Sequence, residues 1–119
     1  MTAVQVHEPL RRLSPLVCHV QVADGAICLR ITGSVSSGDD ATSVVDELTE
    51  ACGLCCGMVL LDVTRCDIDS ELLIAMIRDA ALRATSSRCQ VRVLVDEPDV
   101  VTALSQAGIA RAELPAGTR

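Results

Sequence analysis

The segment best equipped for chemistry is Asp62 to Glu71, which reads DVTRCDIDSE. It leaves an apolar strand and enters a helix, and ligand sites in open α/β sheets lie at such strand ends. Its four carboxylates are of the type used for metal binding and acid–base catalysis, but both histidines lie far earlier in the chain. We therefore expect no enzyme and no metal site here. Asp69 or Ser70 is expected to cap the helix, and Asp67 to be solvated.

The seven cysteines provide a second set of reactive side chains. Cys52, Cys55 and Cys56 are spaced as in a CxxC motif, but a zinc site would need a second pair. The motif also closes a helix, whereas redox motifs open one, where the helix dipole lowers the thiol pKa. We expect most cysteines to be reduced apolar fillers. Cys66, inside DVTRCDIDSE, is the candidate redox-sensitive thiol, and the alternative is a buried, inert side chain.

Composition excludes several classes of partner. The 119 residues include no aromatic side chain, and the net charge is −6. Single-stranded nucleic acid is bound by aromatic stacking, and phosphate backbones are bound by cationic patches, so we expect no nucleic-acid partner. No glycine-rich phosphate loop is present, and we expect no cofactor. An acidic surface suits a basic protein partner better.

No apolar run approaches the length of a membrane helix, and the N-terminus lacks the apolar segment of a secretory signal. We therefore expect no membrane insertion and a cytoplasmic location.

The pattern of apolar residues predicts an N-terminal arm over residues 1–13 and one α/β domain over residues 14–115. The expected elements, in chain order, are strands at 17–22 and 26–31, a helix from 37 to about 53, a strand at 58–63, a helix from about 69 to 84, a strand at 91–95, a helix from 98 that stops at 108, and a short strand near 111–114.

The strands are expected to form a mixed, mostly parallel sheet with the helices packed against it. In the first strand, Cys18, Val20 and Val22 alternate with polar residues and should face the core. The continuous apolar run at 58–63 is typical of a strand buried on both faces.

Several short motifs of this chain, taken in sequence order, resemble those of the STAS domain of bacterial anti-sigma factor antagonists. The resemblance extends over about residues 17 to 114. That family has a hydrophobic strand ending in Asp, a short turn, an Asp-Ser pair and an apolar helix. The matching residues are Leu61-Asp62-Val63, Ile68-Asp69-Ser70, the strand end Ile31-Thr32-Gly33, and the set Val91–Val95, Pro98, Leu104 and Gly108-Ile109.

The resemblance implies a regulatory role. In the family, a serine or threonine at the start of the second helix is phosphorylated by the anti-sigma factor, which is a serine kinase. The unphosphorylated antagonist binds that kinase and frees the sigma factor. Here the phosphosite position is Glu71 and the glycine after it is Leu72, so Ser70 is the remaining candidate. The aspartate usual before the first helix is replaced by Ser36, and the usual terminal helix is missing or very short.

We therefore expect an anti-sigma factor antagonist, monomeric or weakly dimeric, that phosphorylation does not switch. Its expected partner-binding surface comprises Asp67, Asp69, Ser70, Glu71 and an exposed Leu72. The alternative is a STAS subunit of another assembly, such as a lipid-transport ABC system or a stressosome-like particle.

Overall fold

The computed structural model describes residues 15–23, 25–54, 57–84 and 89–112. The expected arm at residues 1–13 and the end of the expected last strand lie outside this part of the chain. The elements in order are β1 (Val17–Ala23), β2 (Ala26–Ser34), α2 (Gly38–Leu54), β3 (Met58–Asp67), α3 (Ser70–Arg83), β4 (Gln90–Leu94) and α4 (Pro98–Gln106).

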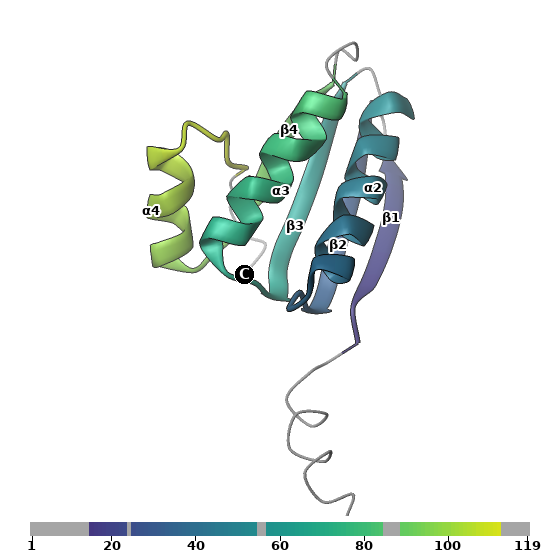
Figure 1. Cartoon of the computed structure of the whole chain (residues 1–119). Coiled ribbons are helices and arrows are strands. Elements are labelled where there is room, and N and C mark those ends of the chain that lie inside the picture. Colours follow the sequence, from purple (N-terminus) through teal and green to yellow (C-terminus); the bar gives the residue numbers. More distant parts are fainter. Residues whose placement is uncertain (1–14, 24, 55–56, 85–88, 113–119) are drawn as a thin grey trace, which may run out of the picture.

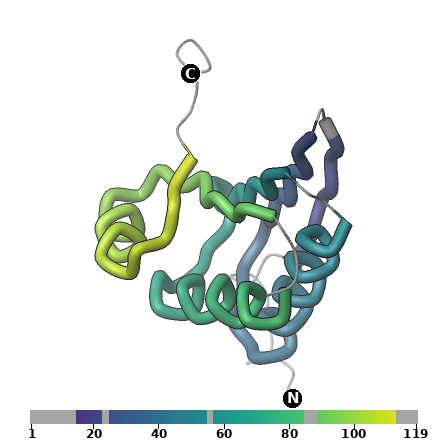
Figure 2. Tube along the Cα trace, turned by 90° about the horizontal axis from the view of Figure 1, so that it is seen from above, coloured from purple at the N-terminus to yellow at the C-terminus, as the bar shows by residue number. Residues whose placement is uncertain are grey.

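The four strands form one sheet in the order β1-β2-β3-β4 (Figure 1). β1 is antiparallel to β2, whereas β2, β3 and β4 are mutually parallel. The expected mixed, mostly parallel α/β sheet is therefore confirmed. Helices α2 and α3 lie side by side on one face of it, and α4 lies beyond α3 (Figure 2).

The core lies between this face and the two helices. Leu29, Leu61 and Val93 are register partners across β2, β3 and β4, and all three side chains are fully buried. Leu48 of α2 and Leu73 of α3 are equally buried on the helical side. The apolar stripes predicted for both helices therefore face the sheet.

Burial of β3 on both faces is the first expectation that proves wrong. Val59, Leu61 and Val63 are buried beneath the helices, but Met58 and Leu60 on the other face are only half-buried. The reason is that α2 and α3 lie on the same face, so neither covers the second face of β3.

The expected burial of one face of β1 is confirmed only for Cys18, which packs against the core, although the orientation of that face is right. Cys18, Val20 and Val22 share the helix-side face with their register partners Ile31, Leu29 and Ile27. Nevertheless, Val20 is 55% exposed and Val22 is 74% exposed. β1 is the outermost strand, and α2 lies over the strands inside it (Figure 1).

The segment after residue 63, expected to be a loop, continues the strand β3 as far as Asp67. Pairing with β2 shifts register between Arg30 and Thr32 and then resumes through Thr32↔Arg65 and Gly33↔Cys66. Cys66 therefore lies in a strand. The β2 strand likewise runs past its expected end at residue 31, to Ser34.

The glycine near the end of β2 has a packing role. Gly33 has φ +96°, and a Cβ at this position would overlap the backbone carbonyl of Pro15, where the chain enters β1. A side chain would therefore be strained both by its backbone conformation and by this close approach.

Helix α2 begins where the sequence predicts, because the Ser37 hydroxyl accepts a hydrogen bond from the Asp40 N–H at 3.1 Å. It ends at Leu54, one residue past the expected stop.

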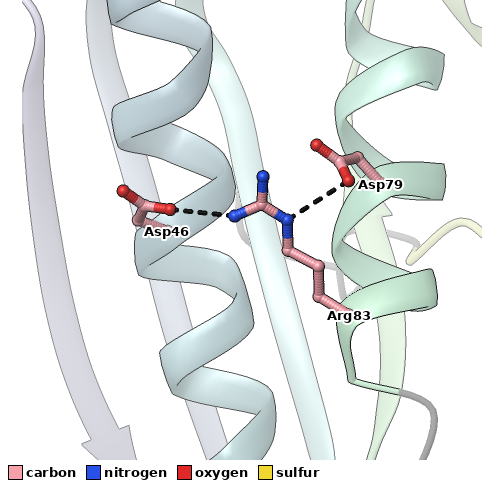
Figure 3. Close-up of polar contacts among 3 residues, drawn as sticks. All are labelled: Asp46, Asp79 and Arg83. Atoms are coloured by element: carbon pink, nitrogen blue, oxygen red, sulfur yellow. Dashed lines mark hydrogen bonds and ion pairs between the residues drawn. The ribbon is translucent and has the colours of Figure 1, made fainter.

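Arg83 of α3 joins the two helices through Asp46 of α2 at 3.2 Å and Asp79 of its own helix at 3.3 Å (Figure 3). All three side chains are exposed, so each pair contributes less than about 1 kcal/mol. Among the described residues, no helix combines the length and apolarity that crossing a bilayer requires.

Candidate functional site

The start of α3 is built around one carboxylate. Asp69 has an extended backbone, with φ −69° and ψ 140°, and its side chain accepts hydrogen bonds from two backbone N–H groups. These are Glu71 N at 3.0 Å and Leu72 N at 3.3 Å. The bonds satisfy two of the donors that a helix start leaves unpaired. Asp69, rather than Ser70, is therefore the N-cap residue.

The next three residues differ in exposure. Ser70 is the first residue of α3 and is half-buried, and Glu71 is exposed in the first turn. Leu72 was expected to be exposed, but it is half-buried and packs against the core. This position follows from helical spacing, because Leu72 lies beside the buried Leu73 and four residues before the buried Met76. The exposed part of this surface is therefore polar.

The start of α2 lies beside the start of α3 (Figure 1). The Val35 N–H donates to the Asp67 carbonyl at 3.0 Å and so ties the chain entering α2 to the end of β3. We call this edge the helix-start corner; its acidic side chains are Asp39, Asp40, Asp67, Asp69 and Glu71. Both helix dipoles favour negative charge at this corner.

The start of α2 is not part of the site that the sequence predicts. The signal was present, because the Ser37-Gly38-Asp39-Asp40 run was assigned to a helix start. Parallel strands bring successive helix starts to the same edge of the sheet. Asp67 is exposed at this corner, as expected.

Asp62 does not belong to the helix-start corner, although it lies in the same ten-residue segment. It is 6% exposed, and its Oδ1 accepts hydrogen bonds from the Thr64 hydroxyl at 2.7 Å and the Thr64 N–H at 3.0 Å. Its Oδ2 lies 3.4 Å from Nε of Arg30 on β2. Asp62 therefore links β2 to β3 and is not free to act as an acid, a base or a metal ligand with the other carboxylates.

Cys66 is half-buried near the corner, and its thiol is free. Burial, and to a smaller extent the neighbouring Asp67 and Cys18, together raise the pKa of the Cys66 thiol to about 11. Of the CxxC-like set, Cys52 is buried in α2, while residues 55 and 56 lie outside the described residues. Within the part of the chain that the structure describes, no group of three His, Cys, Asp or Glu side chains could hold a metal ion.

A cavity of about 440 Å³ between α3 and α4 has Glu71 of the corner in its lining. A second cavity near the corner has a volume of about 70 Å³ and lies between the end of β3 and the start of α4. Its lining includes Cys66, Asp67, Ile68 and Val100. Small-molecule sites usually enclose about 300 to 1,000 Å³. The cavity between β3 and α4 is well below this range, whereas the cavity between α3 and α4 is within it.

The Asp69 cap predicts a measurable stability difference. Asp69→Ala removes both cap hydrogen bonds, and we expect it to lower the free energy of unfolding by about 0.5–2 kcal/mol. Asp67→Ala is the matched control, because that exposed side chain makes no cap and should change stability by less than about 0.5 kcal/mol. Denaturant titration followed by circular dichroism measures both. Equal stability of the Asp69→Ala variant and the unchanged chain would contradict the assigned cap.

The raised pKa of Cys66 predicts slow reaction with alkylating reagents. The reactive thiolate should be about 100-fold less abundant than for a thiol with the ordinary pKa of 9.0. We expect iodoacetamide to modify Cys66 of the folded chain at pH 7.5 far more slowly than in denaturant, with a rate that rises as the pH approaches 11. Since the unfolded thiol ionises first, stability should fall as the pH rises above about 9. Labelling of Cys66 at equal rates in the folded and denatured chain, mapped by mass spectrometry, would instead support a redox-sensitive thiol.

Comparison with known proteins gives matches among solved structures. No protein-family model matches the chain. No curated protein sequence matches it either. The anti-sigma factor antagonist SpoIIAA in its unphosphorylated form is similar, with a TM-score of 0.55 over 84% of this chain and 90% of that chain, at 13% identity. An anti-sigma factor antagonist from Mycobacterium paratuberculosis has a TM-score of 0.61 over 79% of each chain, at 11% identity. At such identities the likeness establishes the fold, and the chain therefore has the STAS fold of anti-sigma factor antagonists.

Proposed function

We propose that this protein is an anti-sigma factor antagonist, which binds a kinase-type anti-sigma factor and so frees a sigma factor. The observation that carries the proposal is the exposed, capped start of α3 in a domain with this fold. The chain acts by occupying its partner and catalyses no reaction. We place its site of action in the cytoplasm, where sigma factors work.

The charge of the helix-start corner defines the partner surface that fits it. Among the ion pairs of the described residues, none involves Asp67, Asp69 or Glu71. The carboxylates of Asp67 and Glu71, and the Oδ1 atom of Asp69, whose Oδ2 caps α3, therefore remain available to cations of another protein. A partner with arginine or lysine side chains around its binding site would be steered to the corner and oriented on it. The surface from Asp67 along α3 to Arg78 is the proposed extent of the contact.

Glu71 supports an antagonist that phosphorylation does not switch. Glu71 has no hydroxyl for a serine kinase to phosphorylate, and it provides one permanent charge, compared with about −1.5 to −2 for a phosphate. The partner surface would have to accommodate this single charge in every complex. A phosphate on Ser70 would place about −1.5 to −2 charges between the carboxylates of Asp69 and Glu71, and such crowding of like charges disfavours the modification.

Partner binding is tested with the full chain and each kinase-type anti-sigma factor of the host, by isothermal titration calorimetry. We expect Asp67→Lys to raise the Kd of the cognate complex at least about tenfold, because it reverses an exposed charge at the contact. Gln90→Lys is the control, since it adds the same side chain at the exposed start of β4 and should leave the Kd unchanged within about twofold.

If no anti-sigma factor binds and a transporter ATPase or a stressosome-like component forms a stoichiometric complex instead, the alternative assembly role is correct. Binding of an anti-sigma factor that Asp67→Lys leaves unchanged would retain the function but move the contact to another surface.

Resistance to phosphorylation is tested separately, by incubating the chain with that anti-sigma factor and ATP and measuring its intact mass. We expect no added phosphate. The variant Glu71→Ser/Leu72→Gly carries the hydroxyl and the glycine that the family resemblance implies, and we expect it to gain one phosphate under the same conditions. This control shows that the kinase is active. One phosphate on the unchanged chain, mapped to Ser70, would contradict the proposal that phosphorylation does not switch this protein.

A further inference from the structure

A group of exposed apolar side chains lies at the opposite end of the sheet from the helix-start corner. Val20 and Val22 project from the helix-side face of β1, and Leu54, at the end of α2, is 74% exposed. Val22 is the register partner of Ile27, near the start of β2. Clustered exposed apolar side chains on a folded domain usually mark a contact surface.

The layer of helices stops short of this group. One flank of α2 is joined to α3 through the Asp46–Arg83 pair (Figure 3). Glu47, Glu50 and Leu54 have the spacing of one helical face, and they belong to the flank that borders β1. No described helix lies over β1 (Figure 1). The result is a groove with an apolar floor from β1 and an acidic wall from α2.

A cavity of about 110 Å³ lies in this groove, lined by Val20, Ile27, Glu47, Glu50, Ala51 and Leu54. This is well below the roughly 300 Å³ of small-molecule sites. It is of a size to accept one large apolar side chain, as the central anchor of a protein interface does. The carboxylates of Glu47 and Glu50 have no ion-pair partner among the described residues.

We propose that this β1–α2 groove binds an amphipathic helix of a partner protein, which packs beside α2 over β1. One apolar side chain of that helix fills the cavity, and its lysine or arginine side chains pair with Glu47 and Glu50. The helix would complete the layer that α2 and α3 leave unfinished. Because the groove lies at the far end of α2 from the helix-start corner, this contact leaves that corner free.

Two other occupants fit the groove less well. A strand added to the free edge of β1 would lie in the plane of the sheet, so it would neither fill the cavity nor reach Glu47 and Glu50. A second copy, docked through the same groove, would place its own Glu47 and Glu50 near those of the first, and like charges at an interface cost binding energy. Charge complementarity therefore favours a cationic helix.

The test uses the full chain and a fluorescent synthetic helix of leucine and lysine, about 15 residues long. A peptide with the same leucines and with glutamate in place of lysine is the matched probe. By fluorescence anisotropy we expect saturable binding of the lysine peptide only. Val22→Gln, Leu54→Gln and Glu47→Gln/Glu50→Gln should each raise its Kd at least about tenfold. Leu82→Gln changes an equally exposed leucine on α3, at 72% exposure, and should alter the Kd less than about twofold.

Several results would overturn the proposal. These are the absence of saturable binding, tight binding of the glutamate peptide, or an equal effect of Leu82→Gln and Leu54→Gln. Methyl NMR provides a second measurement, in which the lysine peptide should shift the signals of Val20, Val22 and Leu54 above all others. Tighter peptide binding after Arg11→Glu/Arg12→Glu would assign the groove to the chain's own N-terminal segment. Sedimentation as a dimer that Val22→Gln dissociates would assign it to a second copy.

Discussion

The parallel direction of β2, β3 and β4 is the constraint on which the site depends. After each parallel strand the connecting helix must carry the chain back to the edge where the next strand begins, so the chain leaves every parallel strand at one edge and starts the next helix there. The starts of α2 and α3 are thereby brought together, with their unpaired N–H groups and positive dipole ends on the same side of the molecule. Aspartates cap or flank both starts, which explains why an acidic corner is compatible with a stable fold.

Local sequence was sufficient for the helices and for the start of α3. Asp69 and Ser70 precede apolar residues at helical spacing, and that pattern predicts the buried stripe and a cap at one of these two residues. The hydrogen bonds of the Asp69 side chain assign the cap to Asp69. It was not sufficient for the length of β3 or the burial of its second face. The segment 64–67 is polar, and only its pairing with the end of β2, after a shift in register, makes it a strand. The apolar run at 58–63 is compatible with a strand that is buried on one face or on both faces. Which faces are buried depends on where α2 and α3 pack against the sheet.

The extension of β3 also explains why DVTRCDIDSE is not one site. Alternation along the strand places Asp62 beneath Arg30 on the sheet face away from the helices, whereas Asp67 emerges at the strand end. If the sequence had predicted a strand that extends to residue 67, it would also have predicted that these two carboxylates lie apart. The exposure of Val20 and Val22 depends on a different fact, the position of β1 at the edge of the sheet, which no local pattern contains.

The order of strands in the sheet, β1-β2-β3-β4, is also their order along the chain. No strand has to be inserted between two others that have already paired. The hairpin of β1 and β2 can form first, and each later strand, arriving with its own helix, adds to a growing edge. Each parallel pairing still joins residues 32 or 33 positions apart in the sequence, such as Ala26 with Met58 and Met58 with Gln90, so the antiparallel hairpin is the pairing with the smallest loop-closure cost. The domain can therefore assemble from its N-terminal side while the ribosome is still delivering β4.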